Sequence, residues 1–305
     1  MEEGTEMMDQ KLISFMSIVR MRSYTGAARE LSLTQPAISH HMRLLEEEYG
    51  HKIFIYEGKK LELTEAGEIL YDHAESASAK ERILKEKLSG LKLKKREVKF
   101  GATMTIGEFT IAPYLSELFR TFPEYHFSIL VDNTNILMEK LRKGEIHFAL
   151  IEGLIDKDFY DAKLLKTCDF ILVTAENHEI TKKQRVMLED LLDEKLIVRE
   201  KGSGSREILE RGLAERNRSL ESFREIIEMG NVNVMKRMTM EGVGISLMYR
   251  DAALEELKQR HLVEVPVENL KMEREFNFVQ IRSETIPVEY QQFLNYFTEK
   301  MQLKP

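Results

Sequence analysis

Apolar residues recur through the first fifty positions of the chain with the spacing of short amphipathic helices. The spacing i, i+3, i+4, i+7 puts them on one face of each helix and predicts short helices over residues 8–49. These apolar residues are Leu12, Phe15, Met16, Val19, Ala27, Ala28 and Leu31. Residues 52–63 then take on a strand-like composition broken by Glu57-Gly58, which predicts a β-hairpin.

A longer helical pattern begins after Thr64, which is suited to cap a helix, and continues to about Leu91. Leu70, Ala77 and Leu84 recur at seven-residue intervals that end on Leu91. Charged residues between them leave little other apolar surface. The narrow seam therefore predicts pairing with a partner helix, and the alternative is packing on the core of its own chain.

Short apolar strands alternate with helical stretches beyond a basic run at residues 92–97, where we place a domain boundary. Such alternation favours an α/β architecture with largely parallel sheets. Near-continuous apolar strands are typical of sheets covered on both faces. The predicted strands are 98–102, 127–131, 148–151, 170–174, 196–198, 244–247, 262–265 and 276–281.

The composition excludes several classes of protein. The chain has 305 residues, of which 43% are hydrophobic and 32% charged, with one Cys and no Trp. These values are typical of a globular protein of two or three domains and exclude collagen-like, low-complexity and disulfide-stapled chains. Cys168 has no second cysteine to pair with, and no apolar run approaches the ~18 residues that a membrane span needs. We therefore expect a cytoplasmic protein without a membrane partner.

The net charge of −7 argues at first against binding to nucleic acid. Residues 1–99, however, hold 17 basic and 17 acidic residues, which leaves 28 basic and 35 acidic residues for positions 100–305. Within positions 20–43, the only acidic residue beside the arginines is Glu30. Because a local basic face matters more to a polyanion than the total charge does, the amino-terminal part is a candidate for binding DNA.

Residues 23–50 have the pattern of two packed helices joined by a turn, the second of which is suited to read DNA. Thr34 can cap this second helix, and Pro36 is tolerated in its first turn. Contact with base edges requires short polar side chains near the positive end of the helix, with an arginine alongside. Lys59 and Lys60 follow the hairpin turn, where they either contact the DNA backbone or minor groove or belong to a solvated turn. The predicted DNA-binding residues are Thr34, Gln35, Pro36, Ser39, His40, Arg43, Lys59 and Lys60.

This segment resembles the winged helix-turn-helix of the LysR-type transcriptional regulators at many fixed offsets. The matching residues are Ala27-Ala28, Leu31, Gln35-Pro36-Ala37, Ser39, Met42, Leu45-Glu46, Gly50, Phe54 and Leu63-Thr64-Glu65-Ala66-Gly67. The resemblance implies a winged helix-turn-helix DNA-binding domain over residues 8–66 and a linker helix over 67–95 that pairs two subunits.

Two departures from the family pattern concern DNA contacts. Tyr56 stands where the family usually has Arg, and His40-His41 stands where it often has Arg or Lys with Gln. Adjacent helical residues point about 100° apart, and no Cys or Asp completes a metal site. We therefore expect these histidines to be solvated or to face DNA.

A Gly/Ser loop in the carboxyl-terminal part is a candidate anion site. A predicted strand runs into Gly202-Ser203-Gly204-Ser205 and then into a helix opened by Arg206. Backbone N–H groups, two hydroxyls and the helix N-terminus would converge with Arg206 on a small anion, although such a loop is more often only a turn. Thr103 and Thr105 offer further hydroxyls after the first strand of this part, where α/β sheets bind ligands.

Residues 96–305 resemble the LysR-family effector domain, which is similar to type II periplasmic binding proteins. The resemblance implies two α/β lobes, over about 96–167 with 267–305 and over about 168–266, with a ligand cleft between them. The string around Arg206 looks most like the subgroup of sulfur-metabolism and carbon-fixation operon regulators, which implies a small anionic metabolite. The effector-binding residues expected on this basis are Thr103, Met104, Thr105, Asn133, Thr134, Glu152, Ser203, Gly204, Ser205, Arg206 and Val243.

Several of these residues have simpler interpretations. Asn133 and Thr134 could only cap the following helix, and Glu152 could only pair with Arg206 or another basic residue. An unpaired Glu152 in the cleft would instead favour a cationic or zwitterionic ligand. Cys168 is expected to be a buried structural thiol, since no second Cys could resolve an oxidised form.

Together these features predict a ligand-responsive, sequence-specific DNA-binding regulator of a metabolic operon, either an activator or a repressor. Its expected partners are promoter or operator DNA, a small-molecule effector and further copies of itself in a homodimer or homotetramer, with RNA polymerase as a further candidate. The chain lacks the common catalytic motifs, and we expect no enzyme activity, no cofactor and no bound metal. The alternatives are a cytoplasmic small-solute-binding protein and a constitutive regulator with a vestigial pocket.

Overall fold

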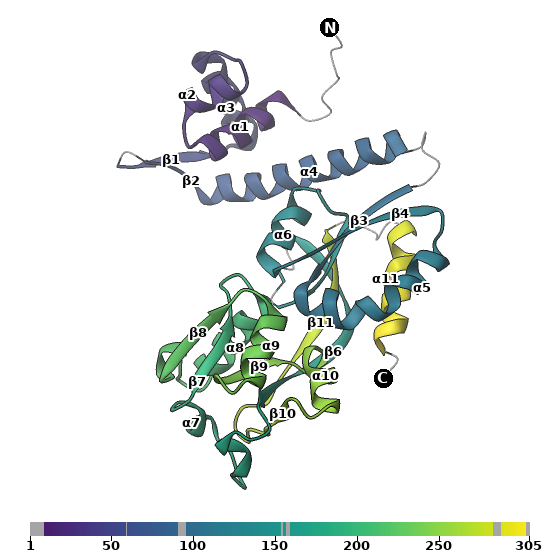
Figure 1. Ribbon diagram of the computed structural model, residues 1–305. Coiled ribbons are helices and arrows are strands. Elements are labelled where there is room, and N and C mark those ends of the chain that lie inside the picture. The colour runs from purple at the N-terminus through teal and green to yellow at the C-terminus, as the bar shows by residue number, and fades with distance from the viewer. Residues whose placement is uncertain are drawn as a thin grey trace. The chain divides into compact units, whose positions relative to one another are not determined.

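Figure 1 shows the computed structural model, which describes residues 9–58, 60–90, 96–153, 155–156, 159–282 and 288–302. The chain forms two compact units, residues 1–93 with 142–145 and residues 94–141 with 146–305. We call them the amino-terminal unit and the carboxyl-terminal unit. We also expect domain boundaries at residues 66 and 95, and a division of residues 96–305 into two lobes. These boundaries stay predictions.

Three helices and a hairpin begin the amino-terminal unit, as the apolar spacing predicts. The elements are α1 (Gln10–Met21), α2 (Tyr24–Glu30), α3 (Gln35–Tyr49), β1 (Phe54–Glu57) and β2 (Lys60–Leu63). The Ser23 hydroxyl caps α2 by accepting a hydrogen bond from the Gly26 N–H at 3.1 Å. The inward faces of the helices form one core with the start of the hairpin, which contains Phe15, Ile18, Ala27, Ile38, Met42, Leu45 and Ile53.

The long helix α4 (Glu65–Gly90) begins directly against the hairpin. Thr64 caps it as predicted, because its hydroxyl accepts a hydrogen bond from the Gly67 N–H at 3.0 Å. A Cβ on Gly67 would lie 2.2 Å from the Ile53 carbonyl oxygen, so glycine is what allows the first turn of α4 to approach β1 so closely.

The predicted seam of α4 is divided between two environments. Leu70 is only 8% exposed and packs in the core of its own unit. At this position the helix therefore follows the alternative expectation, packing on its own chain, and not pairing with a partner helix. Leu84 is 38% exposed, and Ile69 and Leu88, which lie off the seam, are 68% and 56% exposed. Leu91 lies outside the described residues. Pairing of α4 with a second subunit stays a prediction, and its apolar surface includes Ile69, Leu84 and Leu88.

A mixed nine-stranded sheet runs through the described part of the carboxyl-terminal unit. Its strands are β3 (Arg96–Thr103), β4 (Tyr125–Asp132), β5 (Phe148–Glu152), β6 (Tyr160–Thr174), β7 (Lys195–Arg199), β8 (Glu225–Met229), β9 (Ile245–Tyr249), β10 (Val263–Glu264) and β11 (Met272–Ile281). They follow the order β4-β3-β5-β11-β6-β9-β7-β8, with β10 beside β6. Pairing is parallel in β4-β3-β5 and in β9-β7-β8, whereas β6 and β11 run antiparallel to their neighbours. The expected parallel arrangement is therefore confirmed only at the two ends of the sheet.

Two strands differ from the sequence-based expectation for a physical reason. β6 begins at Tyr160, well before the predicted start at residue 170, and its first half mixes charged and apolar residues. β8 is absent from the predicted strands, and it is a half-exposed edge strand that begins with Glu225. Strands that are only partly buried need fewer apolar residues, so an apolar run does not reveal them.

Helices and a dense aromatic core complete the carboxyl-terminal unit. Phe148 stacks on Phe100 and Phe278, with ring centroids 5.0 and 4.4 Å apart. The helices are the π-helix η1 (Ile106–Ile111), α5 (Ala112–Thr121), α6 (Thr134–Arg142), α7 (Leu188–Leu191), α8 (Gly204–Ala214), α9 (Val232–Met240), α10 (Arg250–Lys258) and α11 (Val288–Gln302), with short 3-10 turns at Glu179–Lys182 and Leu220–Ser222. Among the described residues, no helix combines the length and the apolar character that crossing a membrane would take.

Cys168 is a buried thiol on β6, as predicted. It is 5% exposed, and its Sγ lies 3.3 Å from Oδ1 of Asp251. Burial raises the pKa of the Cys168 thiol to about 12, and the nearby Asp251 carboxylate adds to the effect. The thiol is therefore protonated at neutral pH, which fits a structural role.

Candidate DNA-binding helix and effector site

Helix α3 separates an apolar face from a polar face. Ile38, Met42 and Leu45 are buried in the core of the amino-terminal unit. The Thr34 hydroxyl caps the helix by accepting a hydrogen bond from the Ala37 N–H at 3.3 Å, and Pro36 lies in the first turn. The predicted DNA-contacting residues on α3 and its cap are exposed except for Ser39, which is half-buried; they are Thr34, Gln35, Pro36, Ser39, His40 and Arg43.

The polar side chains of α3 bond to one another along the helix surface. The Gln35 amide donates to the Ser39 hydroxyl at 2.9 Å, and the Arg43 guanidinium lies 3.0 Å from Nδ1 of His40. Because a guanidinium only donates, Nδ1 of His40 is the acceptor in this pair. Arg43 also lies 3.7 Å from a carboxylate oxygen of Glu47. Contacts between exposed side chains contribute little free energy, so base edges or phosphates can replace them.

The two adjacent histidines do different things. His40 is exposed on the polar face, whereas Nδ1 of His41 lies 2.7 Å from the Ser14 hydroxyl of α1 and links the two helices. Within the described part of the chain, no three His, Cys, Asp or Glu side chains are grouped so as to hold a metal ion. Ser14 is a fully buried residue that the apolar pattern does not reveal, and it positions α3 against α1.

The structure describes one of the two lysines that are predicted to contact DNA from the hairpin. Lys60 is exposed at the start of β2, where its backbone lies opposite that of Glu57 in β1, and Gly58 in the turn has φ +65°. Lys59 lies outside the described residues. The role of both lysines in binding the DNA backbone stays a prediction.

Four segments of the carboxyl-terminal unit converge on Glu152. The parallel strands β3 and β5 are neighbours, so their carboxyl ends lie side by side, and the Thr103 hydroxyl donates a hydrogen bond to the Glu152 carboxylate. The Thr134 hydroxyl donates to the Glu152 carbonyl oxygen at 3.4 Å and accepts from the Gly204 N–H at 3.2 Å. We call Thr103, Thr134, Glu152 and Gly204 the Glu152 cluster.

The start of α8 packs tightly against this cluster. A Cβ on Gly204 would lie 2.5 Å from the Glu152 carbonyl oxygen. Beside it, the Asn135 N–H donates to the Gly202 carbonyl oxygen at 3.3 Å. The Ser203 and Ser205 hydroxyls lie 2.9 Å apart and both residues are buried. Residues predicted separately from two distant stretches of sequence therefore meet in one place.

The charged groups near the cluster are arranged differently from the sequence-based expectation. Arg206 does not pair with Glu152: its guanidinium contacts Glu210 at 2.8 Å, Glu228, and the carbonyl oxygen of Arg199 at 3.1 Å. The expected convergence of the Arg206 side chain on a bound anion therefore lacks support in this geometry, because carboxylates already hold its guanidinium.

Arg199 is a residue near the cluster that the sequence-based list of site residues omits. It is 5% exposed, its guanidinium donates to both Glu200 carboxylate oxygens at 2.8 and 2.9 Å, and it lies 3.2 Å from the Met104 sulfur. The sequence does contain a signal for Arg199: it ends an apolar strand that leads into the Gly/Ser loop, and α/β sheets bind ligands at such strand ends.

Of the remaining predicted effector residues, Asn133 and Thr105 adjoin this region, whereas Val243 lies at the opposite end of β7. The Asn133 side chain caps α6 by accepting from the Ile136 N–H at 3.0 Å, which is its simpler interpretation. Thr105 is buried just before η1. Val243 is 38% exposed in the turn between α9 and β9, where the neighbouring Gly244 packs on Lys195 at the amino end of β7, and the Gly/Ser loop follows the carboxyl end of that strand. Contact of any of them with an effector stays a prediction.

Glu152 should make the stability of the carboxyl-terminal unit depend on pH. Burial raises the pKa of its carboxyl from 4.5 to about 6, against the opposing effects of the Thr103 hydrogen bond and the Arg199 charge. Between these two pH values the folded state holds a proton that the unfolded state has lost, so stability falls as pH rises through this window.

The expected loss between pH 4.5 and pH 7 is about 2 kcal/mol for this group, and Glu152→Gln should lack it. The measurement is urea unfolding of both proteins across this pH range. Equal pH dependence in the two proteins would contradict the assignment.

Comparisons with known proteins match both units. Residues 92–302 match the family model described as LysR substrate binding domain, and residues 10–68 match the one described as bacterial regulatory helix-turn-helix protein, lysR family. The HTH-type transcriptional regulator CysL of Bacillus subtilis is 26% identical over 269 residues, covering 88% of this chain and 89% of CysL. The HTH-type transcriptional activator CmpR of Synechocystis is 27% identical over 285 residues and covers 92% of each chain.

Solved structures have the same fold. The regulatory domain of Synechocystis CcmR in complex with 2-PG has a TM-score of 0.61 at 18% identity, covering 68% of this chain and 99% of that one. Full-length LysG of Corynebacterium glutamicum with bound effector Arg has a TM-score of 0.62 at 15% identity, covering 95% and 96% of the two chains. At these identities the likeness concerns the fold.

Proposed function

Because the chain belongs to the LysR family, it is a DNA-binding transcriptional regulator that responds to a small-molecule effector, and we propose that α3 with the hairpin binds operator DNA while the Glu152 cluster binds the effector. The observation that carries the DNA part is the capped helix α3, whose apolar face is buried and whose polar face is exposed. We propose further that the protein acts in the cytoplasm on a metabolic operon, catalyses no reaction, needs no cofactor and contacts RNA polymerase.

Arg43→Ala should weaken binding to the DNA upstream of the gene that encodes this protein by about 5- to 150-fold, which is the range for one lost base contact. Lys60→Ala should weaken binding to all DNA sequences alike. It should also reduce the slope of log affinity against log salt concentration by about one, as loss of a phosphate contact does. Fluorescence anisotropy at several salt concentrations measures both. Lys182→Ala is the control, because that lysine is 67% exposed in the other unit. Wild-type affinity in the Arg43 variant would contradict the proposal.

The effector is proposed to be a small anionic metabolite bound at the start of α8. Backbone N–H groups at a helix N-terminus favour negative charge, and the Ser203 and Ser205 hydroxyls lie beside them. The complex of CcmR with 2-PG is consistent with this class. In a thermal-shift panel on the full chain, an organic phosphate or carboxylate should stabilise the wild type, and Ser203→Ala should need about tenfold more of it.

The Glu152 carboxylate supports a second candidate class of effector. It is 2% exposed, and the two nearby arginines are paired elsewhere: Arg206 with Glu210 and Glu228, and Arg199, whose charge acts on Glu152, with Glu200. A ligand carrying an ammonium or guanidinium group would compensate this charge, and LysG, with its bound effector Arg, is an example within the fold. Stabilisation by amino acids or amines in the same panel, with none by anions, would favour this class. A panel without any stabiliser would favour a constitutive regulator.

The chain is proposed to form a homodimer through α4, which can pair further into a homotetramer. A hollow of about 810 Å³ lies between the end of α3 and the start of α4 and is lined in part by Tyr49, Ile53 and Ile69. Tyr49 and Ile69 are 47% and 68% exposed, so apolar surface is open to a partner. Ile69→Glu should shift the protein toward monomer in light scattering after gel filtration. An unchanged mass would place the interface elsewhere.

A further inference from the structure

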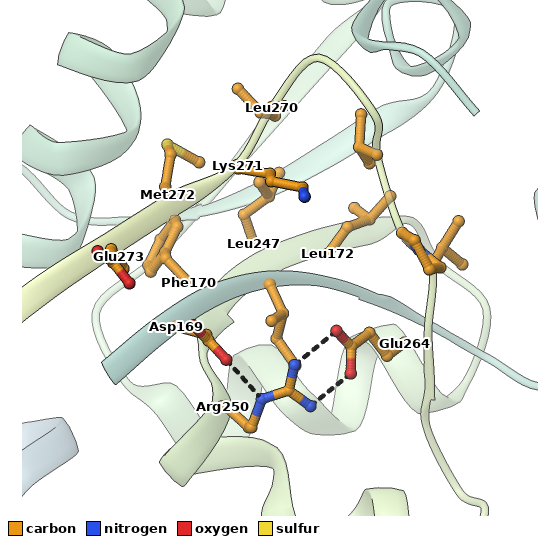
Figure 2. A pocket seen from close by; sticks show the side chains of 14 residues that line it. Asp169, Phe170, Leu172, Leu247, Arg250, Glu264, Leu270, Lys271, Met272 and Glu273 are labelled. Atoms are coloured by element: carbon orange, nitrogen blue, oxygen red, sulfur yellow. Dashed lines mark hydrogen bonds and ion pairs between the residues drawn. The ribbon is translucent and has the colours of Figure 1, made fainter. Parts of the chain in front are cut away.

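A hollow of about 620 Å³ lies in the carboxyl-terminal unit away from the Glu152 cluster. Residues 265–271 connect β10 to β11 as an arch, and the hollow lies under this arch, as Figure 2 shows. Its other walls come from β6, the middle of β9 and the start of α10. The residues that line it include none of those predicted to bind the effector.

The floor of the hollow is apolar and well packed. Phe170 and Leu172 of β6, Leu247 of β9, and Leu270 and Met272 at the base of the arch line it. All five are less than 10% exposed, so these side chains have fixed positions. An aliphatic or aromatic body of a few carbons could lie on this floor in van der Waals contact with it.

The acidic wall of the hollow is already neutralised in part. The Arg250 guanidinium donates to both carboxylate oxygens of Glu264 at 2.5 and 2.7 Å, and to Asp169 at 3.2 Å. This bidentate pair is rigid and holds β10, β6 and α10 together. Neither carboxylate is left to attract a cation on its own, and Arg250 is not left to attract an anion.

Lys271 is the basic lining residue that keeps an open charge, and Glu273 is the acidic one. It is exposed, and among the described residues its ammonium has no hydrogen bond or ion pair. Figure 2 shows the ammonium on the side of the hollow where Leu172 and Leu247 lie, and away from Glu273. Glu273 also lines the hollow, at its other end, and disfavours a second negative charge on a ligand.

The arch over the hollow is tied down rather than loose. The Asn269 side chain accepts a hydrogen bond from the Leu188 N–H at 2.8 Å, and the Arg216 guanidinium donates to the Asn269 carbonyl oxygen. Val267 also forms a β-bridge with Val186. The hollow is therefore formed before any ligand arrives, which lowers the cost of binding.

We propose that this hollow is a second ligand site, which binds a small monocarboxylate with an aliphatic body. The carboxylate pairs with Lys271, and the body covers Leu172, Leu247 and Met272. The single open cation selects one negative charge, and the apolar floor selects the body. The site is independent of DNA binding and of the effector assigned to the Glu152 cluster.

Hexanoate, hexanol and hexylamine are matched probes for this site, because they share one body and differ in charge. Calorimetric titration of the full chain should show the tightest binding for hexanoate. Lys271→Gln should weaken hexanoate binding about tenfold, Lys271→Arg should retain it within about threefold, and Lys182→Gln should not change it. Circular dichroism checks that the variants fold, which the exposure of Lys271 leads us to expect.

Three outcomes would overturn the proposal. The first is no hexanoate binding, and the second is equal binding of hexylamine or hexanol. The third is unchanged hexanoate affinity in Lys271→Gln, which would place the probe elsewhere in the protein. None of these outcomes depends on DNA binding, so each leaves the proposed regulatory function untouched.

Discussion

Glu256→Leu should lower the free energy of unfolding of the carboxyl-terminal unit by about 3–5 kcal/mol, because it leaves a buried lysine without its partner. Lys236 of α9 is 5% exposed, and its ammonium lies 2.7 Å from a carboxylate oxygen of Glu256 on α10. The same ammonium lies 4.3 Å from the centre of the Phe109 ring in η1. Leucine can fill the space of Glu256 but cannot solvate the charge.

The double variant Lys236→Met with Glu256→Leu is the informative control, because it removes both charges. It should recover most of the lost stability, since apolar residues of similar size often replace a buried ion pair without loss. Glu179→Leu is the matched exposed control, as Glu179 and Lys182 form a pair of similar length with side chains 81% and 67% exposed. Urea unfolding measures all three. A Glu256→Leu protein as stable as the Glu179→Leu protein would contradict the expectation.

The helices of the amino-terminal unit could be predicted from the sequence because their signals are local. The spacing of Phe15 and Ala27 sets the apolar faces, and Thr34 and Thr64 cap the helices that follow them. The hairpin turn at Gly58 is equally local. The side chain of Ser14, by contrast, bonds to His41, 27 residues away, and only the packing of α1 on α3 brings them together.

The charges around the effector site could not be predicted because they depend on distant elements. The sequence predicts Thr103 and Glu152 as site residues separately, but their hydrogen bond follows from the parallel pairing of β3 with β5. Arg206 faces Glu228 on β8, an edge strand that has no apolar run to reveal it. Without β8, the sequence leaves Arg206 free to point toward an anion. The Gly/Ser loop marks a place where segments touch at Gly204, and anion binding there stays a prediction.

Gly204→Ala should lower the free energy of unfolding of the carboxyl-terminal unit by about 3 kcal/mol, toward the upper end of the cost of overpacking. The added Cβ would lie 2.5 Å from the Glu152 carbonyl oxygen and 2.7 Å from the Thr134 hydroxyl. The nearest of these atoms belongs to the backbone of β5, so a rotamer change cannot relieve the contact. Alanine suits the first turn of a helix, and the cost is therefore steric rather than conformational.

The start of α8 must then move away from β5 and α6, which breaks the hydrogen bond from the Gly204 N–H to Thr134. Compounds that stabilise the wild type should no longer stabilise this variant, while its affinity for DNA without a ligand should stay within about threefold. Gly230→Ala is the matched control, because a Cβ there meets no atom within 4 Å. Urea unfolding, thermal shift and anisotropy measure these effects. If Gly204→Ala matched Gly230→Ala in stability and in ligand response, the contact between α8 and the Glu152 cluster would not couple the effector to the fold.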